Sequence, residues 1–506
     1  MKTNPRAVLI TLVSLCLAAI RSSAYAVSPP PDGGYPGGNT AEGELALGSL
    51  TTGFYNTAVG IYSLLSITDG SFCTGVGAGT LLVNTAGENT ATGAGALFSN
   101  TTGMANTADG AFALFNNTGG LASSDNPDGV SPGSFNTATG NRALFSNTTG
   151  TENTANGAFA LLGNIEGFDN TATGSNALRS NTIGNNNTAT GAFALLNNSE
   201  GDNNTATGFG ALSSNLTAEQ NTATGAGALS SHITGNGNTA NGALALLNDT
   251  DGQINTATGA SALFSNTTGS FNTADGVSAL FSNTAGGDNT ATGAQALQSN
   301  IDGNDNTAVG LNALLNNTSG DNNIAFGRSA GAQQTTGSNN VYIGANIGGV
   351  AGESNACYVG SIFGQTSSGG IPVLINANNK LGTTVSSKRF KEAIKPMDEA
   401  SQAILALKPV TFRYKREVDP AGISQFGLVA EEVEKVNPDL IVRDKEGKAY
   451  SVRYDQVNAM LLNEFLKEHA RVEQLEERVE QLTTLLQKVS ARIEMKGSET
   501  QFAQTQ

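Results

Sequence analysis

Residues 187–203 read NTATGAFALLNNSEGDN, and units of this kind recur along most of the chain. The opening triplet Asn-Thr-Ala repeats with a constant step of 17 residues at Asn153, Asn170, Asn187, Asn204, Asn221, Asn238, Asn255, Asn272, Asn289 and Asn306. The step loses one residue before Asn89 and is interrupted by an insertion near residues 120–134. A fixed period of this length is typical of stacked arrays and outweighs local propensity. The sequence therefore predicts a repeat region over residues 39–360.

Each unit combines a short extended piece, Asn-Thr-Ala-Thr, with a glycine that can take positive φ and an Asn-Thr-Thr-Gly turn. Its dependable apolar anchor is an Ala-Leu pair, as in Ala262-Leu263, and one such pair is too little to stabilise a coil alone. Two architectures supply the missing contacts. Coils can stack as a β-solenoid with strands about 4.8 Å apart, or three chains can bury the leucines between subunits as a trimeric β-roll. The in-phase asparagines are placed to form amide ladders from coil to coil.

A disordered low-complexity tract is the alternative for this region, given its Gly, Asn and Thr content. Disorder gives no reason for a leucine at the ninth place of each unit. Threonine pairs such as Thr188 and Thr190 also recur, and on a flat face they would form a glycan- or ice-binding surface. Asp109 and Asn156 interrupt the second column of these threonines, and solvated strand propensity is the commoner reason for such residues.

The N-terminus predicts export. Residues 1–26 have a basic start at Lys2 and Arg6 and an apolar run over residues 7–20, as in a secretory signal peptide. The run is short for a membrane anchor, so we expect no transmembrane segment after its removal and a secreted or cell-surface protein. Residues 27–38 read as a Pro/Gly linker.

Composition narrows the function classes. The formal charge of −16 and the pI near 4.6 argue against nucleic acid as a partner. Cys73 and Cys357 are too far apart for a disulfide framework, and each is expected to be a small buried side chain. His232 is interpreted as a drifted turn residue, and His469 as a solvated helix residue. We predict no metal site and no cofactor.

The last quarter of the chain is charged and predicts a small α+β domain followed by a coiled coil. Residues 361–385 leave the repeat and form a neck. Beyond it we expect a helix over 398–407, strands over 410–414 and 449–454, a segment at 427–436 that begins extended and turns helical, and a helix from Asp455 to about Lys496. The heptads of that last helix have Val472, Val479, Leu486 and Ile493 at a, and Leu475, Leu482 and Val489 at d. By the rule for parallel coiled coils this pattern leans towards a dimer.

Ser386 and Lys391 lie five positions apart where the repeat and neck give way to this domain. Serine becomes a nucleophile when a base takes its proton, and a lysine can be that base where its charged form is disfavoured. Ser–Lys pairs are an accepted variant of this arrangement. On spacing alone, two unrelated surface residues are the commoner explanation.

Three motifs give these residues a context: SSKRFKEAIKPM at 386–397, KPVTFRY at 408–414 and FGLVAEEV at 426–433. In this order they resemble the intramolecular chaperone domain of phage endosialidases, tail spikes and tail fibres. The resemblance implies a domain that directs trimerisation of the fibre before it and then cuts itself off. The repeat is also loosely similar to the heads of trimeric autotransporter adhesins.

Carried over by position, the resemblance makes Ser386 the nucleophile, Lys391 the base and Val385–Ser386 the bond that is cut. Two residues depart from the family pattern: Ser387 stands where the family often has Asp, and Glu431 where it often has Gln. Folding assistance is therefore the safer inference, and any enzyme activity would be a single-turnover self-cleavage by a Ser–Lys peptidase without a diffusible substrate.

The sequence as a whole predicts a secreted, homotrimeric, fibre- or adhesin-like surface protein. Its chaperone domain would span 386–460, its coiled coil 461–496 and a short tail 497–506. A surface glycan or host-cell ligand is a possible further partner. The alternatives are a glycan- or ice-binding repeat protein with an uncleaved trimerisation domain, and a conventional secreted hydrolase, for which the repeat offers no catalytic constellation.

Overall fold

The computed structural model describes residues 35–120 and 131–503, with side chains to Lys496. The predicted signal peptide, most of the 27–38 linker and the end of the 497–506 tail lie outside the described residues. The chain divides into two compact units, one ending at Gln365 and the other beginning at Thr366, and each is described by itself.

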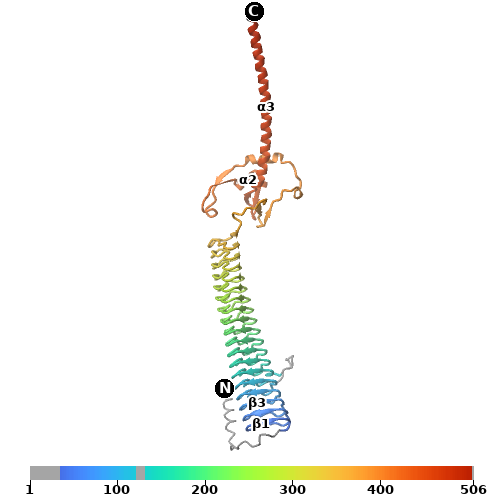
Figure 1. The fold of residues 1–506 in the computed structure, drawn as a ribbon, viewed down its shortest axis with the longest axis vertical. Helices are drawn as coiled ribbons and strands as arrows, with labels where there is room; N and C mark the ends of the chain where they lie inside the picture. Colours follow the sequence, from blue (N-terminus) through green and yellow to red (C-terminus); the bar gives the residue numbers. More distant parts are fainter. Residues whose placement is uncertain (1–34, 121–130, 504–506) are drawn as a thin grey trace. The chain divides into compact units, whose positions relative to one another are not determined.

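The first unit is a β-solenoid, and within the described residues its wall is a 19-stranded parallel sheet (Figure 1). Each three-residue strand pairs with the strand of the next coil, so that Thr188 lies opposite Thr205. The strands are β1 (Thr40–Glu42), β2 (Thr57–Val59), β3 (Thr74–Val76), β4 (Thr90–Thr92), β5 (Thr107–Asp109), β6 (Thr137–Thr139), β7 (Thr154–Asn156), β8 (Thr171–Thr173), β9 (Thr188–Thr190), β10 (Thr205–Thr207), β11 (Thr222–Thr224), β12 (Thr239–Asn241), β13 (Thr256–Thr258), β14 (Thr273–Asp275), β15 (Thr290–Thr292), β16 (Thr307–Val309), β17 (Ile324–Phe326), β18 (Val341–Ile343) and β19 (Cys357–Val359). The predicted solenoid with a 17-residue period is confirmed.

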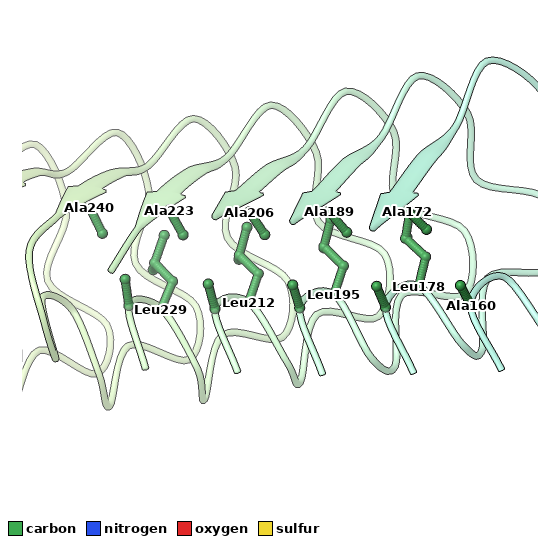
Figure 2. Close-up of a cluster of buried hydrophobic side chains, with 14 of the residues drawn as sticks. Ala160, Ala172, Leu178, Ala189, Leu195, Ala206, Leu212, Ala223, Leu229 and Ala240 are labelled. Carbon is green, nitrogen blue, oxygen red and sulfur yellow. The ribbon is translucent and has the colours of Figure 1, made fainter. Parts of the chain in front are cut away.

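Alanine and leucine side chains fill the inside of each coil (Figure 2). Ala189 comes from the middle of β9, and Ala194 and Leu195 come from the opposite side of the same coil. All three are fully buried within the single chain. Of the two architectures that the sequence left open, the stacked solenoid is the one that covers the leucines, because each coil closes around its own leucine and stacks on its neighbours.

The coils are held in register by buried asparagine side chains, as the recurrence of these residues predicted. The opening asparagine of each unit accepts from the backbone of the next coil: Asn187 Oδ1 lies 3.0 Å from the backbone nitrogen of Asn204. A second column, which we call the amide column, runs through the solenoid at the twelfth place of each unit. In it, Asn198 Nδ2 donates to Asn181 Oδ1 at 2.8 Å and to the carbonyl of Gly201 at 2.9 Å.

Tight backbone turns close each coil. Gly191, at the end of β9, has a φ of +128°, and a Cβ built there would lie 2.6 Å from the carbonyl oxygen of Gly208 in the next coil. The predicted need for glycine at this place is confirmed. Leucines such as Leu195 (φ +50°) also adopt the left-handed region, which the sequence does not indicate.

The two cysteines differ. Cys73 takes the place of the opening asparagine in its unit and is buried, and burial raises the pKa of its thiol. Cys357 begins the last strand of the solenoid and is exposed. The expectation of a buried side chain is wrong for Cys357, because its side chain lies at an outward-facing place of β19, as Thr188 does in β9.

The second unit is built from short elements and one long helix. In chain order they are β20 (Val373–Ile375), β21 (Leu381–Thr383), the 3-10 helices η1 (Lys388–Phe390) and η2 (Asp398–Ala406), β22 (Val410–Phe412), β23 (Gln425–Gly427), α2 (Ala430–Val436), the 3-10 helix η3 (Pro438–Leu440), β24 (Ile441–Arg443), β25 (Ala449–Val452) and α3 (Tyr454–Ala503). The strands pair as three antiparallel hairpins, β20–β21, β22–β23 and β24–β25.

A small core joins α2, η3, the last hairpin and α3. Val433, Leu440, Ile441, Val452 and Met460 are its buried members. The segment expected as a helix from Asp398 is the 3-10 helix η2, and Asp398 is its first residue instead of its N-cap. No helix among the described residues is long and apolar enough to cross a bilayer.

We predict that Gly191→Ala destabilises the solenoid by at least about 2 kcal/mol, because the new methyl group meets a backbone carbonyl and φ must change. Gly210→Asn is the matched control, since Gly210 has open space around it and its place in other units is taken by Asn176 and Asn312. Thermal unfolding measures both variants. Equal losses of stability would contradict the assigned packing.

Candidate functional site

Ser386 and Lys391 meet in the structure. Lys391 Nζ lies 3.1 Å from Ser386 Oγ. The 3-10 helix η1 stands between them, and its turn is closed by backbone bonds from Phe390 to Ser387 and from Lys391 to Lys388. This single tight turn folds the lysine back onto the serine, which explains why a separation of five residues suits the pair.

The pair lies in an open, solvent-exposed place. Ser386 and Lys391 are both exposed, and they line a shallow pocket together with Lys388, Ala393 and Ile394. A lysine serves as a base where burial or nearby positive charge disfavours its charged form. Lys388 brings a positive charge to the same pocket, but in the single chain nothing buries Lys391. The geometry of a Ser–Lys pair is present without the desolvation that activates it.

The bond that the pair would cut is accessible. Val385 precedes the serine, follows the strand β21 and is about half exposed. The Val385–Ser386 bond therefore lies in a short connection between the β20–β21 hairpin and η1. Cutting it would separate the solenoid and the hairpin from the rest of the second unit.

Around this pair, the second unit exposes apolar side chains that a folded domain normally buries. Leu405 is 75% exposed and Phe426 is 83% exposed, whereas the leucines at the ninth place of the solenoid units, from Leu64 to Leu314, are at 0%. Other exposed apolar residues of this unit before α2 are Ile371, Val373, Leu374, Ile375, Leu381, Val385, Phe390, Ile394, Val418, Ile423 and Val429. A single copy of this unit thus leaves most of its apolar surface in water.

The long helix α3 exposes a second apolar surface. The predicted heptad positions all lie within α3 and are exposed: Val472, Leu475, Val479, Leu482, Leu486, Val489 and Ile493. The helix itself is confirmed. Its pairing into a coiled coil stays a prediction, because the structure contains one chain.

A second Ser–Lys contact, which the sequence did not indicate, joins η2 to α3. Ser401 Oγ lies 3.2 Å from Lys467 Nζ and 2.7 Å from Asn463 Nδ2, and it donates to Glu464 Oε1. Lys467 is paired with Glu464 at 2.7 Å, and Ser401 is fully buried. A buried serine beside a paired lysine has no access to a peptide bond, so this cluster anchors α3 to η2. Its residues are more than 60 positions apart, so no local motif reveals them.

No cluster of three or more His, Cys, Asp or Glu residues in the described part of the chain is arranged to hold a metal ion.

Comparison with known proteins gives one positive result. Residues 386–442 match the family model described as chaperone of endosialidase, and the match begins at Ser386 itself. Neither the curated proteins nor the solved structures contain a match to this chain. The segment from Ser386 to residue 442 is thus of the chaperone-of-endosialidase type, and it follows a β-solenoid that fits the architecture of a tail spike or fibre.

Proposed function

We propose that this chain is an exported, homotrimeric fibre protein whose C-terminal unit drives assembly and then cuts the Val385–Ser386 bond. One observation carries the proposal: the unit that contains the match to the chaperone family has a core of only five buried apolar side chains in a single chain, whereas each solenoid coil encloses its own alanines and leucine. Secretion or display at a cell surface accords with the family and with the predicted signal peptide.

Further copies of the chain would supply the missing contacts of the second unit. Hydrophobic burial is the main favourable term in folding, at about 25 cal/mol per Å². A unit with five buried apolar residues in its core and far more at its surface gains most of that term only by association. A second copy and a third copy of the same surface would be its partners, as the family of the matching segment suggests.

Charges on α3 favour parallel helices. With Val472 at a, Arg471 and Arg478 occupy g positions and Glu476 occupies an e position. In a parallel, in-register bundle, g of one helix faces e of the next heptad on its neighbour, which places Arg471 opposite Glu476. An antiparallel arrangement would bring g positions together and set arginine against arginine. Parallel helices also bring equivalent repeats of the copies side by side.

Assembly would begin at α3. Joining three helices raises the effective concentration of the attached solenoids and lowers the entropic cost of bringing equivalent coils together. The solenoid needs help only while it forms, because its first coils bury little before others stack on them. Once formed, it buries its own leucines and can persist without the chaperone.

Self-cleavage would proceed within one chain. Lys391 Nζ takes the proton of Ser386 Oγ, and Oγ attacks the carbonyl carbon of Val385. The peptide nitrogen of Ser386 leaves as an amine, so that an ester joins Val385 to Ser386 Oγ. Water then hydrolyses the ester and leaves a carboxylate on Val385. Copies that pack over the exposed Ile394 and Phe390 would bury Lys391 and couple cleavage to assembly.

The outer face of the solenoid supports a second candidate function, binding to ice. The first residue of every strand from β2 to β16 is a threonine, and these threonines lie in register on a parallel sheet. The column from Thr57 to Thr307 is unbroken and fully or partly exposed. Such spacing presents hydroxyl and methyl groups as a regular lattice.

Thermal hysteresis tests this candidate. If the face binds ice, the protein separates freezing from melting, and Thr205→Lys in the middle of the column lowers the effect severalfold. Asn197→Lys, at an exposed residue outside the strands, is the control and should leave it unchanged. Absence of hysteresis in the unmodified protein would eliminate ice as the ligand.

For self-cleavage, we expect the unmodified chain to give two fragments on a denaturing gel, with the new N-terminus at Ser386. Ser386→Ala and Lys391→Met should each stay full length, because one lacks the nucleophile and the other the base. Lys395→Met is the control, since Lys395 is an exposed lysine of the same segment that does not line the pocket. Full-length unmodified protein, or cleavage of Ser386→Ala, would refute the assignment.

For assembly, we expect the mature chain to sediment as a trimer. Val479→Asp with Leu482→Asp should yield monomers and lower the amount of soluble solenoid, because carboxylates replace apolar residues at the helix contact. Glu477→Gln, at an outward f position, should assemble normally. A monomeric unmodified chain with a folded solenoid would overturn the proposal.

A further inference from the structure

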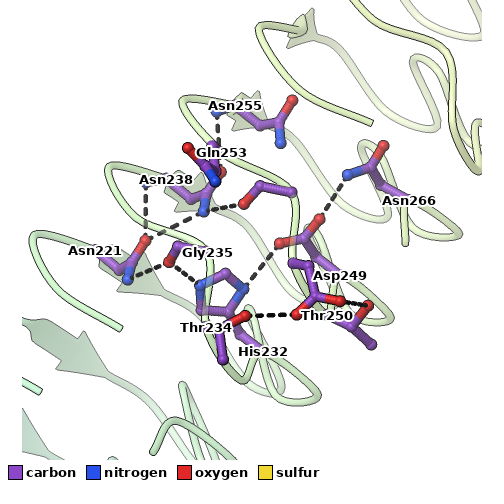
Figure 3. Close-up of polar contacts among 12 residues, drawn as sticks. Asn221, His232, Thr234, Gly235, Asn238, Asp249, Thr250, Gln253, Asn255 and Asn266 are labelled. Atoms are coloured by element: carbon purple, nitrogen blue, oxygen red, sulfur yellow. Dashed lines mark hydrogen bonds and ion pairs between the residues drawn. The ribbon is translucent and has the colours of Figure 1, made fainter. Parts of the chain in front are cut away.

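The amide column changes its chemistry at one point. Along most of its length the members are asparagines: Asn84, Asn100, Asn117, Asn147, Asn164, Asn181, Asn198, Asn215, Asn266, Asn283, Asn300 and Asn317. Each of them except Asn84 and Asn266 donates its Nδ2 to the Oδ1 of the asparagine in the preceding coil. Between Asn215 and Asn266 the column contains His232 and Asp249 instead (Figure 3).

His232 is therefore not the drifted turn residue that its sequence suggested. Its side chain is 0% exposed, as is that of Asp249. His232 Nδ1 lies 2.8 Å from Asp249 Oδ2, and the other ring nitrogen, Nε2, bonds to the carbonyl oxygen of Gly235 (Figure 3). The ring thus takes over the bond to the glycine carbonyl that an asparagine makes elsewhere in the column.

These contacts fix where protons must lie. The Gly235 carbonyl only accepts, so His232 Nε2 carries a hydrogen. The facing pair Nδ1 and Oδ2 also needs one hydrogen between them, because otherwise two lone pairs would meet at 2.8 Å in a site without water-exposed surface. The pair holds this proton whether it is written as an ion pair or as a neutral imidazole beside a protonated carboxyl.

Two neighbouring residues add to the need for a proton between His232 and Asp249. Asn266 Nδ2 donates to Asp249 Oδ1 at 2.5 Å, and Asp251, whose Oδ1 accepts from Thr234 Oγ1 at 2.5 Å, adds a second negative charge nearby. Burial, and to a lesser extent Asp251, raises the pKa of the Asp249 carboxyl. Removing the shared proton would leave a buried carboxylate that faces a bare imidazole nitrogen.

The presence of His232 in place of an asparagine also removes one hydrogen bond from the amide column. Asn215 Oδ1 is buried and has no hydrogen-bond partner among the described residues, because His232 has no donor to offer to the preceding coil. An unpaired buried acceptor costs about 1–3 kcal/mol. The coil that contains His232 is thus held on that side by fewer side-chain bonds than its neighbours.

We propose that His232 and Asp249 form a buried proton-binding site that makes the solenoid most stable at mildly acidic pH and weakens it at alkaline pH. The unfolded chain releases the corresponding proton from histidine at about pH 6.5, whereas the folded pair retains it above that pH. Above pH 6.5 the folded state binds one proton more than the unfolded state. The free energy of unfolding therefore falls as pH rises, until the folded pair also loses its proton.

Histidine NMR of the full chain tests the site directly, because the chain has two histidines and His469 is an exposed internal reference. The imidazole nitrogens are labelled, and the signals of the two histidines are followed over pH 5–9. The His232 signals should show a protonated Nε2 and no loss of the Nδ1 proton up to at least pH 8. Two histidines that titrate together would overturn the proposal.

Thermal unfolding over pH 5–9 supplies the second measurement. The double variant His232→Asn/Asp249→Asn rebuilds the uniform column and gives Asn215 Oδ1 a donor. Relative to this variant, the unfolding equilibrium of the unmodified chain should shift towards the unfolded state by up to tenfold per pH unit above pH 6.5. Parallel pH profiles for the two proteins would contradict the proposal, even though both fold.

Discussion

Each coil of the solenoid satisfies its polar backbone and its buried amides on the next coil. The backbone bonds between coils mostly join residues 16 to 18 places apart, and the bonds between buried asparagines join a residue to its equivalent in the next coil. Because these side chains pair with their own equivalents, strand register and side-chain register are set together. The same register continues across the insertion near residues 120–134, since β5 pairs with β6.

The two units manage apolar surface in opposite ways. A solenoid coil wraps its leucine in its own backbone and in its neighbours, so one chain completes the core. The unit after Thr366 has a small core of five buried apolar residues and leaves larger side chains, such as Phe426, in water. The proposed dependence on other copies thus falls in the unit that contains the match to a chaperone family.

Much of this could be predicted from the sequence, because identical residues at one spacing dictate identical contacts. The 17-residue period predicted the stacked coils, and the need for a glycine after each strand was predicted correctly. The motifs from Ser386 onward indicated the family whose model matches this segment. The left-handed leucines, such as Leu195, could not be foreseen, because local propensity disfavours that conformation and only the closing of the coil imposes it.

Three further points depend on long-range geometry and could not be settled from the sequence. Whether the leucines are covered by the same chain or by other subunits stayed open, because a linear unit does not show that it closes on itself. His232 was interpreted as a turn residue because its partner, Asp249, lies one whole coil away. The cluster at Ser401 depends on α3, more than 60 residues downstream. Local sequence patterns are enough to predict the repeat fold. The role of a residue that differs from the repeat in one unit depends on contacts with distant segments.

The interchangeability of the coils has a consequence for how this molecule changes over generations. Loss or duplication of one unit within β7 to β16 joins two surfaces that are already complementary, so recombination between copies of the repeat would alter the rod in steps of about 4.8 Å without a new interface. The length of the solenoid can therefore vary between related sequences through the number of repeats alone. The two coils that contain His232 and Asp249 are the exception. If a deletion removed only one of them, a carboxylate or an imidazole nitrogen would be left buried without its partner.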